Sequence, residues 1–132
     1  MHLKSYCKET YMEIVNAENV ICDNYKGRNE SFMFFLHERD LFSQEKFWEL
    51  YDSIIALKGM AFTEPELARQ VNSIYQYVLK TMIWHFSPTD SLTIENFPAE
   101  YNGYIERLDY AVSVFYAGNA TIADESIFEL QR

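Results

Sequence analysis

The sequence predicts an all-α protein: one domain over residues 1–132, built as a bundle of five or six helices around a central helix at residues 63–86. The chain is 48% hydrophobic and 17% aromatic, which is enough apolar surface for one core. It has only four glycines and three prolines, too few for the frequent turns of a β-sandwich or barrel. The third observation is the helical spacing of apolar residues along most of the chain.

The predicted central helix carries the longest periodic pattern. Thr63 and Glu66 have the spacing of a capping box, and Pro65 fits the first turn. One face collects apolar residues at helical spacing: Leu67, Val71, Ile74, Tyr75, Val78 and Met82. Beyond Tyr77 the helix is apolar on nearly every side, which is typical of a helix wrapped by its neighbours. Pro88 disfavours helical geometry at the residue before it and predicts the end of the helix.

The remaining segments are assigned from the same spacing. Apolar stripes predict further helices at residues 3–21, 43–58, 98–117 and 123–130. Ser43 fits an N-cap, and so does Asn96 or Phe97, while Gly59 and Gly118 fit helix C-terminal ends.

Residues 31–40 are ambiguous, because five apolar residues in a row at 32–36 suit either a buried strand or a short buried helix. We expect a helix capped by Ser31. A strand at 32–36 would make the fold α+β.

The charge distribution limits the classes of partner. Of the net charge of −9, residues 87–132 contribute −6, from 8 acids and 2 bases. Binding to a nucleic acid backbone requires a basic surface, so direct nucleic acid binding is not expected. No apolar run is long enough to span a bilayer. The first residues contain no apolar segment of the kind found in signal peptides, so a cytoplasmic protein is expected.

No motif for catalysis, a metal or a cofactor occurs in the sequence. The three histidines are scattered, and no pair of Cys or His residues has the short spacing of a zinc site. Cys7 and Cys22 are 15 residues apart on one predicted helix, which separates them by about 22 Å, too far for a disulfide. No serine lies in a nucleophile elbow, and no glycine-rich phosphate loop is present. The protein is therefore predicted to be a non-enzyme without a cofactor or metal.

The acidic second part of the chain suggests a surface for a basic partner. On the predicted helix at 98–117, Tyr110 falls on the outward side near Glu106 and Asp109. An exposed aromatic ring surrounded by acids is typical of a protein interface, although another helix covering Tyr110 is an equally good interpretation. The predicted partner-binding residues are Glu106, Asp109, Tyr110, Asp124 and Glu125, with Asp90 and Glu95 as a second location.

One stretch resembles a known group of proteins. Residues 84–90 (WHFSPTD), 94–98 (IENFP) and Tyr101 followed by 104–108 (YIERL) resemble the small, acidic, mostly helical immunity proteins of bacterial polymorphic-toxin and contact-dependent growth inhibition systems. The resemblance implies a cytoplasmic protein that binds the C-terminal toxin domain of an effector and blocks its active site. Such toxins are often nucleases with basic clefts, which fits the acidic composition. The resemblance transfers no individual binding residue.

The sequence also allows a function of a different class. A small helical regulatory domain would bind an apolar small molecule among its aromatic side chains. An enclosed aromatic cavity would distinguish this alternative from a coherent acidic face.

Overall fold

A computed structural model describes residues 2–89, 93–118 and 125–132, with side chains from residue 13 onward. The helices are α1 (His2–Lys26), α2 (Phe32–Glu38), α3 (Gln44–Ala56), α4 (Pro65–Phe86) and α5 (Tyr101–Ala117), followed by a 3-10 turn at Glu125–Ile127. The described residues contain no strand, so the all-α prediction is confirmed, including the helical interpretation of residues 32–36. None of these helices combines the length and the apolar character needed to cross a membrane.

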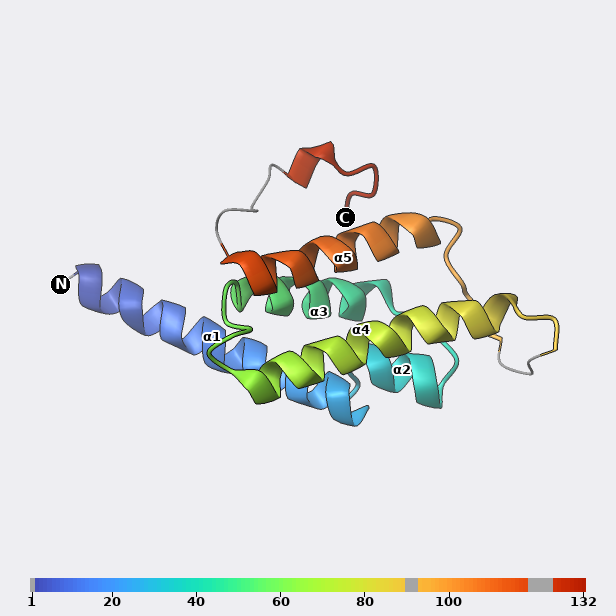
Figure 1. Ribbon diagram of the computed structural model, residues 1–132, viewed down its shortest axis with the longest axis horizontal. Coiled ribbons are helices and arrows are strands. Elements are labelled where there is room, and N and C mark those ends of the chain that lie inside the picture. Colours follow the sequence, from blue (N-terminus) through green and yellow to red (C-terminus); the bar gives the residue numbers. More distant parts are fainter. Residues whose placement is uncertain (1, 90–92, 119–124) are drawn as a thin grey trace.

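The helices pack around one core. α3 contacts α1, α2 and α5, while α4 packs against α1 and α5 (Figure 1). Buried side chains from all five helices form a single cluster. The stripe predicted on α4 is the face that it buries: Leu67, Val71, Ile74, Val78 and Met82 are buried, with Tyr75 half-buried beside them.

Two helices begin at the predicted serine caps. Ser31 Oγ accepts a hydrogen bond from Phe34 N at 3.2 Å, and Ser43 Oγ accepts one from Lys46 N at 3.2 Å. Both bonds satisfy a backbone N–H of the first turn that has no partner within the helix. Ser31 and Ser43 are therefore confirmed as N-caps.

The capping box predicted for α4 is wrong. Its N-cap is Glu64, whose side chain makes no capping hydrogen bond. Thr63 Oγ1 instead donates to Met60 O at 3.3 Å, because the chain turns back on itself before the helix begins. Glu66 reaches Arg69, at 2.6 Å, one turn further along the helix.

The start of α5 also differs from the prediction. The helix begins at Tyr101 after the N-cap Glu100, and Pro98 lies buried in the preceding connection. Asn96 is not a cap, because its side chain binds both the backbone N–H and the carbonyl of Phe42, at 2.7 and 2.9 Å. Gly118 does end the helix, with a positive φ of 74°.

The ends of the chain differ from the predicted elements as well. α1 continues to Lys26, five residues beyond the prediction, and Gly27 forms the following turn with a positive φ of 61°. The last helix, predicted at residues 123–130, is only the three-residue 3-10 turn within the described residues 125–132.

The C-terminal half of α4 is not wrapped by its neighbours, in contrast to the prediction. Ile83 is 67% exposed, Phe86 is 56% exposed and Trp84 is 36% exposed. α4 extends past the helices that cover its first half, so apolar residues around its circumference remain on the surface (Figure 1). The exposed end of α4 forms part of the candidate site.

Candidate partner-binding surface

An apolar surface runs along α4 and the adjoining side of α5. Tyr75, Leu79, Ile83 and Phe86 are three or four residues apart and therefore share one side of α4. Two contacts place α5 beside them: Tyr75 Oη donates to Asp109 Oδ1 at 3.1 Å, and the rings of Phe86 and Tyr101 are 5.0 Å apart. We define the α4–α5 face by its apolar residues: Tyr75, Leu79, Ile83, Phe86, Tyr101 and Ile105.

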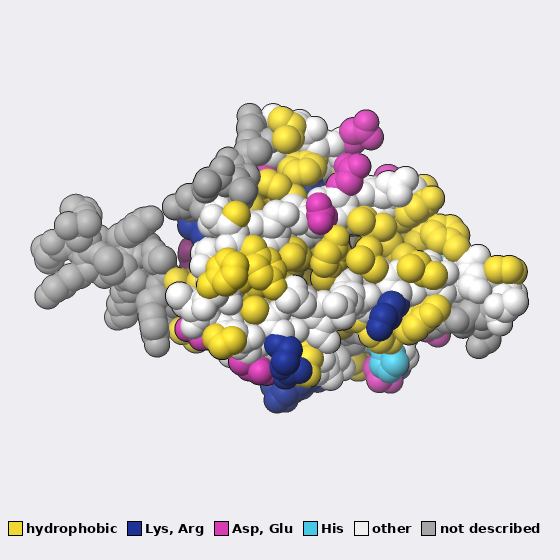
Figure 2. Space-filling model, in the orientation of Figure 1, with side chains coloured by type: hydrophobic (Ala, Val, Ile, Leu, Met, Phe, Trp, Pro, Cys, Tyr) yellow, Lys and Arg dark blue, Asp and Glu magenta, His cyan; other side chains and the backbone are white. Residues whose placement is uncertain are grey.

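The α4–α5 face is exposed at one end and bordered by acids. Hydrophobic side chains gather over α4 and the adjoining part of α5, with acidic side chains along their upper edge (Figure 2). Glu106 and Asp109 are exposed, three residues apart on α5, and therefore on one strip of that helix. Partial burial, with the Asp109 carboxylate as the next cause, raises the pKa of Tyr75. The structure thus places two of the predicted partner-binding residues together beside an exposed apolar surface.

Tyr110 lies on a different side of α5. It is half-buried, packs against the core, and has its ring 5.1 Å from that of Phe128 in the C-terminal segment, residues 125–132. Tyr110 is thus partly covered, although by the C-terminal segment and not by the helix that the alternative interpretation expected. Its ring is therefore not part of the α4–α5 face.

Glu125 is bound to side chains of α3 and α5. Its Oε1 accepts hydrogen bonds from Arg107 Nη1 at 2.6 Å and from Tyr51 Oη at 2.7 Å. Arg107 is only 2% exposed and also donates through Nε and Nη2 to the carbonyl of Leu130, at 3.0 and 2.8 Å. The guanidinium carbon lies 4.4 Å from the ring centre of Phe128. Glu125 therefore helps to attach the C-terminal segment to α3 and α5.

The sequence analysis did not identify a role for Arg107. The helix is covered on both sides, by α3 and by the C-terminal segment, so it buries more than one stripe. A signal was present in the sequence: Leu108, Ala111 and Val114 extend the apolar surface around the helix, and all three are buried. An arginine within such a surface requires partners from elsewhere in the chain.

The remaining predicted residues do not join the α4–α5 border. Glu95 is exposed, and its backbone N–H donates to Asp40 O at 3.0 Å in the connection before α3. Asp90 and Asp124 lie outside the described residues. His85 accepts a hydrogen bond from Ile94 N at 3.0 Å and stacks on Phe97 at 4.0 Å. Its contacts hold the connection that leads to α5.

Tyr51 gives the cluster around Arg107 a measurable pH dependence. Burial, with the hydrogen bond to Glu125 as the second cause, raises the pKa of Tyr51 to about 12 from 10.0. The folded state thus binds the phenolic proton more tightly than the unfolded state does. We expect the stabilising contribution of Tyr51 to be complete below pH 10 and to be lost as the pH rises from 10 toward 12.

The measurement is the urea midpoint of the wild type and of Tyr51→Phe at pH 8, 9, 10 and 11. The difference between the two proteins should shrink above pH 10, because phenylalanine does not titrate there. A difference that is constant over this range would contradict the assignment.

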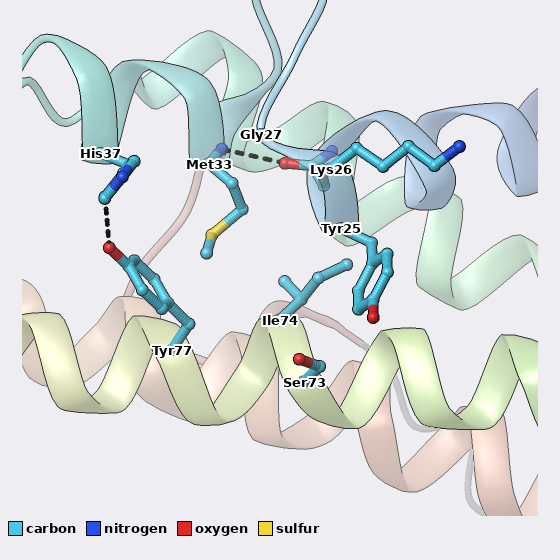
Figure 3. A pocket seen from close by; sticks show the side chains of 9 residues that line it. Tyr25, Lys26, Gly27, Met33, His37, Ser73, Ile74 and Tyr77 are labelled. Atoms are coloured by element: carbon cyan, nitrogen blue, oxygen red, sulfur yellow. Dashed lines mark hydrogen bonds between the residues drawn. The ribbon is translucent and has the colours of Figure 1, made fainter.

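Two hollows in the surface bear on the alternative function, a regulatory domain that binds an apolar small molecule. One, of about 180 Å³, lies between the end of α1, α2 and α4 (Figure 3). Met33 and Ile74 point into it, while Tyr77 and His37 close one side with Tyr77 Oη 2.5 Å from His37 Nδ1. Pockets for drug-sized ligands usually hold about 300–1,000 Å³, so this hollow is small for an apolar ligand.

A larger hollow, of about 660 Å³, lies between α5 and the C-terminal segment, and much of its lining is polar: Gln44, Glu100, Asn102, Glu129 and Gln131. Neither hollow combines a sufficient volume with an apolar lining, so the α4–α5 face is the better candidate site.

Within the described residues, no three His, Cys, Asp or Glu side chains are grouped so that they could hold a metal ion. Comparison of the chain with protein-family models, with curated proteins and with solved structures gives no match.

Proposed function

We propose that the protein is a non-catalytic immunity protein, which binds a cognate bacterial toxin domain in the cytoplasm and neutralises it. The observation that carries this proposal is the α4–α5 face, where Ile83 and Phe86 are 67% and 56% exposed and where the α5 border carries the exposed acids Glu106 and Asp109. Apolar side chains exposed together on a small domain mark a contact surface for another protein. Aromatic anchors within a polar rim are the usual anatomy of such an interface.

The acidic rim indicates the chemistry of the partner. The chain has a net charge of −9, and the border of the α4–α5 face adds Glu106 and Asp109 at the contact itself. Complementary charge accelerates association and selects the partner, while apolar anchors slow dissociation. A toxin nuclease with a basic active-site cleft presents the matching potential, and an acidic protein seated on that cleft excludes the nucleic acid substrate.

The resemblance to immunity proteins falls on the same part of the molecule. Its segments, residues 84–90 and 94–98, Tyr101 and residues 104–108, include Phe86, Tyr101 and Ile105 of the α4–α5 face and Glu106 of its border. The resemblance and the exposed surface therefore support the same proposal from different observations.

The proposal predicts a toxin domain encoded beside this gene, and co-expression with that domain tests it. Cells that produce this toxin domain are expected to grow only when the protein is present, and the two chains should purify as a complex. Ile83→Asp combined with Phe86→Asp should remove both protection and the complex, since it places charges in the apolar contact.

The double variant must retain the circular dichroism of the wild type, because both side chains are exposed. Protection by the folded double variant equal to that of the wild type would show that the α4–α5 face is not the binding surface. Absence of protection by the wild type would contradict the proposed function itself.

A further inference from the structure

Two arginines hold the C-terminal segment, and they differ in how far their side chains are buried. Arg107 is a buried residue of α5, and it binds the segment at Glu125 and Leu130. Arg132 lies on the segment itself and is bound on the surface, where its side chain is 45% exposed and that of Asp52 is 54% exposed. Exposed ion pairs contribute little to stability, so the contact of Arg132 is the weaker of the two.

The receptor for Arg132 is built on one helix. Asp52 accepts two hydrogen bonds from the guanidinium, both at 2.7 Å, which is the bidentate geometry specific to arginine. The same guanidinium lies 4.7 Å from the ring centre of Trp48. Trp48 and Asp52 are four residues apart on α3 and therefore on one side of the helix. We call this pair the Trp48–Asp52 site.

The indole of the Trp48–Asp52 site is held by contacts within the rest of the protein. The rings of Phe47 and Tyr51 each contact the indole of Trp48 edge-on, with ring centres 5.3 Å apart, and the guanidinium carbon of Arg107 lies 5.2 Å from its ring centre. None of these contacts involves Arg132. The departure of Arg132 would uncover a preorganised indole and a carboxylate, without a change in the core.

We propose that the Trp48–Asp52 site binds an arginine side chain of a basic polypeptide partner, and that Arg132 is an internal occupant which this arginine displaces. The exchange replaces one bidentate guanidinium by another, so neither the charge of Asp52 nor the face of Trp48 loses its partner. Because Arg107 still holds residues 125–130, the exchange needs only the last part of the segment to move. The proposal rests on the proposed function in one respect, namely that the toxin domain supplies the basic surface.

The first experiment uses the full-length chain and the probe N-acetyl-arginine amide. Arg132→Gln vacates the site, and Arg132→Gln with Asp52→Asn serves as the matched control. The readout is the NMR signal of the Trp48 indole N–H, distinguished from that of Trp84 by comparison with Trp84→Phe. We expect a saturable shift in Arg132→Gln, a weaker apparent affinity in the wild type because Arg132 competes, and no saturation in the double variant.

N-acetyl-lysine amide at equal ionic strength controls for nonspecific attraction. The arginine probe should bind at least about threefold more tightly, because an ammonium group cannot reproduce the bidentate, stacked geometry. Equal binding of the two probes, or equal responses of Arg132→Gln and the double variant, would overturn the proposed site.

The second experiment separates this site from the proposed function. The affinity of the toxin domain should fall in Asp52→Asn, and equal affinities for the wild type and Asp52→Asn would refute the use of the site by the partner. If the arginine probe binds but no toxin complex forms, the arginine site is supported and the immunity function is contradicted.

Discussion

Replacement of Arg107 by methionine is expected to lower the free energy of unfolding by about 3 kcal/mol, since removal of one partner from a buried charged network is strongly destabilising. Methionine retains much of the length of the side chain but none of its donors. The carbonyl of Leu130 loses both of its bonds to the guanidinium, and Glu125 loses its ion pair. The stacking of Arg107 on Phe128 is lost as well. Urea unfolding followed by circular dichroism measures the change.

Limited proteolysis provides a second readout, because the C-terminal segment should detach before the helices unfold. Chymotrypsin is expected to cleave at Phe128 faster in Arg107→Met than in the wild type. Glu125→Gln is the matched comparison: the side-chain oxygen of glutamine can still accept the hydrogen bonds of Arg107 and Tyr51, so this substitution should cost only about 1 kcal/mol. If Arg107→Met unfolds and is cleaved as the wild type is, Arg107 does not hold the segment.

The sequence predicted those features of the fold that depend on neighbours along the chain. Ser31 and Ser43 bind backbone groups three residues away, so their capping role can be recognised from the sequence. Asn96 binds the backbone of Phe42, 54 residues away, and is therefore unavailable to cap α5. The cap predicted at Thr63 was wrong for a related reason, because its hydroxyl donates a hydrogen bond within the turn that precedes the helix. Local spacing cannot indicate such competing partners.

In the candidate site, too, the features that depend on sequence neighbours were predicted and those that depend on distant residues were not. Glu106 and Asp109 were predicted to lie together because residues three apart share a helix face, and they do. Glu125 was predicted to lie on the same surface, yet its partner Tyr51 is 74 residues away in the sequence and binds its carboxylate on another side of the molecule. The exposure of Ile83 and Phe86 could not be predicted, because an apolar helix surface has the same sequence whether a neighbour covers it or not.

The substitution of Ile83 and Phe86 by alanine should weaken binding of the toxin domain about 100-fold, if each side chain contributes as a moderate interface hot spot. The loss should appear mainly in the dissociation rate, since these groups act after the encounter. Phe62→Ala is the matched control: Phe62 is also an exposed aromatic, at 82%, but it lies before α4 and contacts Tyr116 rather than the α4–α5 face. Surface plasmon resonance measures both rates. A loss that is equally large in Phe62→Ala would exclude a specific role for the face.

Charge reversal on the border of the α4–α5 face should change the association rate. Glu106→Lys with Asp109→Lys is expected to slow association by about tenfold at low salt and to flatten its dependence on ionic strength, because the two acids attract the basic partner before contact. Dissociation should change less than in the alanine variant. Asp109 also accepts a hydrogen bond from Tyr75, so Asp109→Asn, which can still accept this bond, separates the effect of charge from that of packing. Association of the reversed variant at the wild-type rate in low salt would place the acidic contact elsewhere on the molecule.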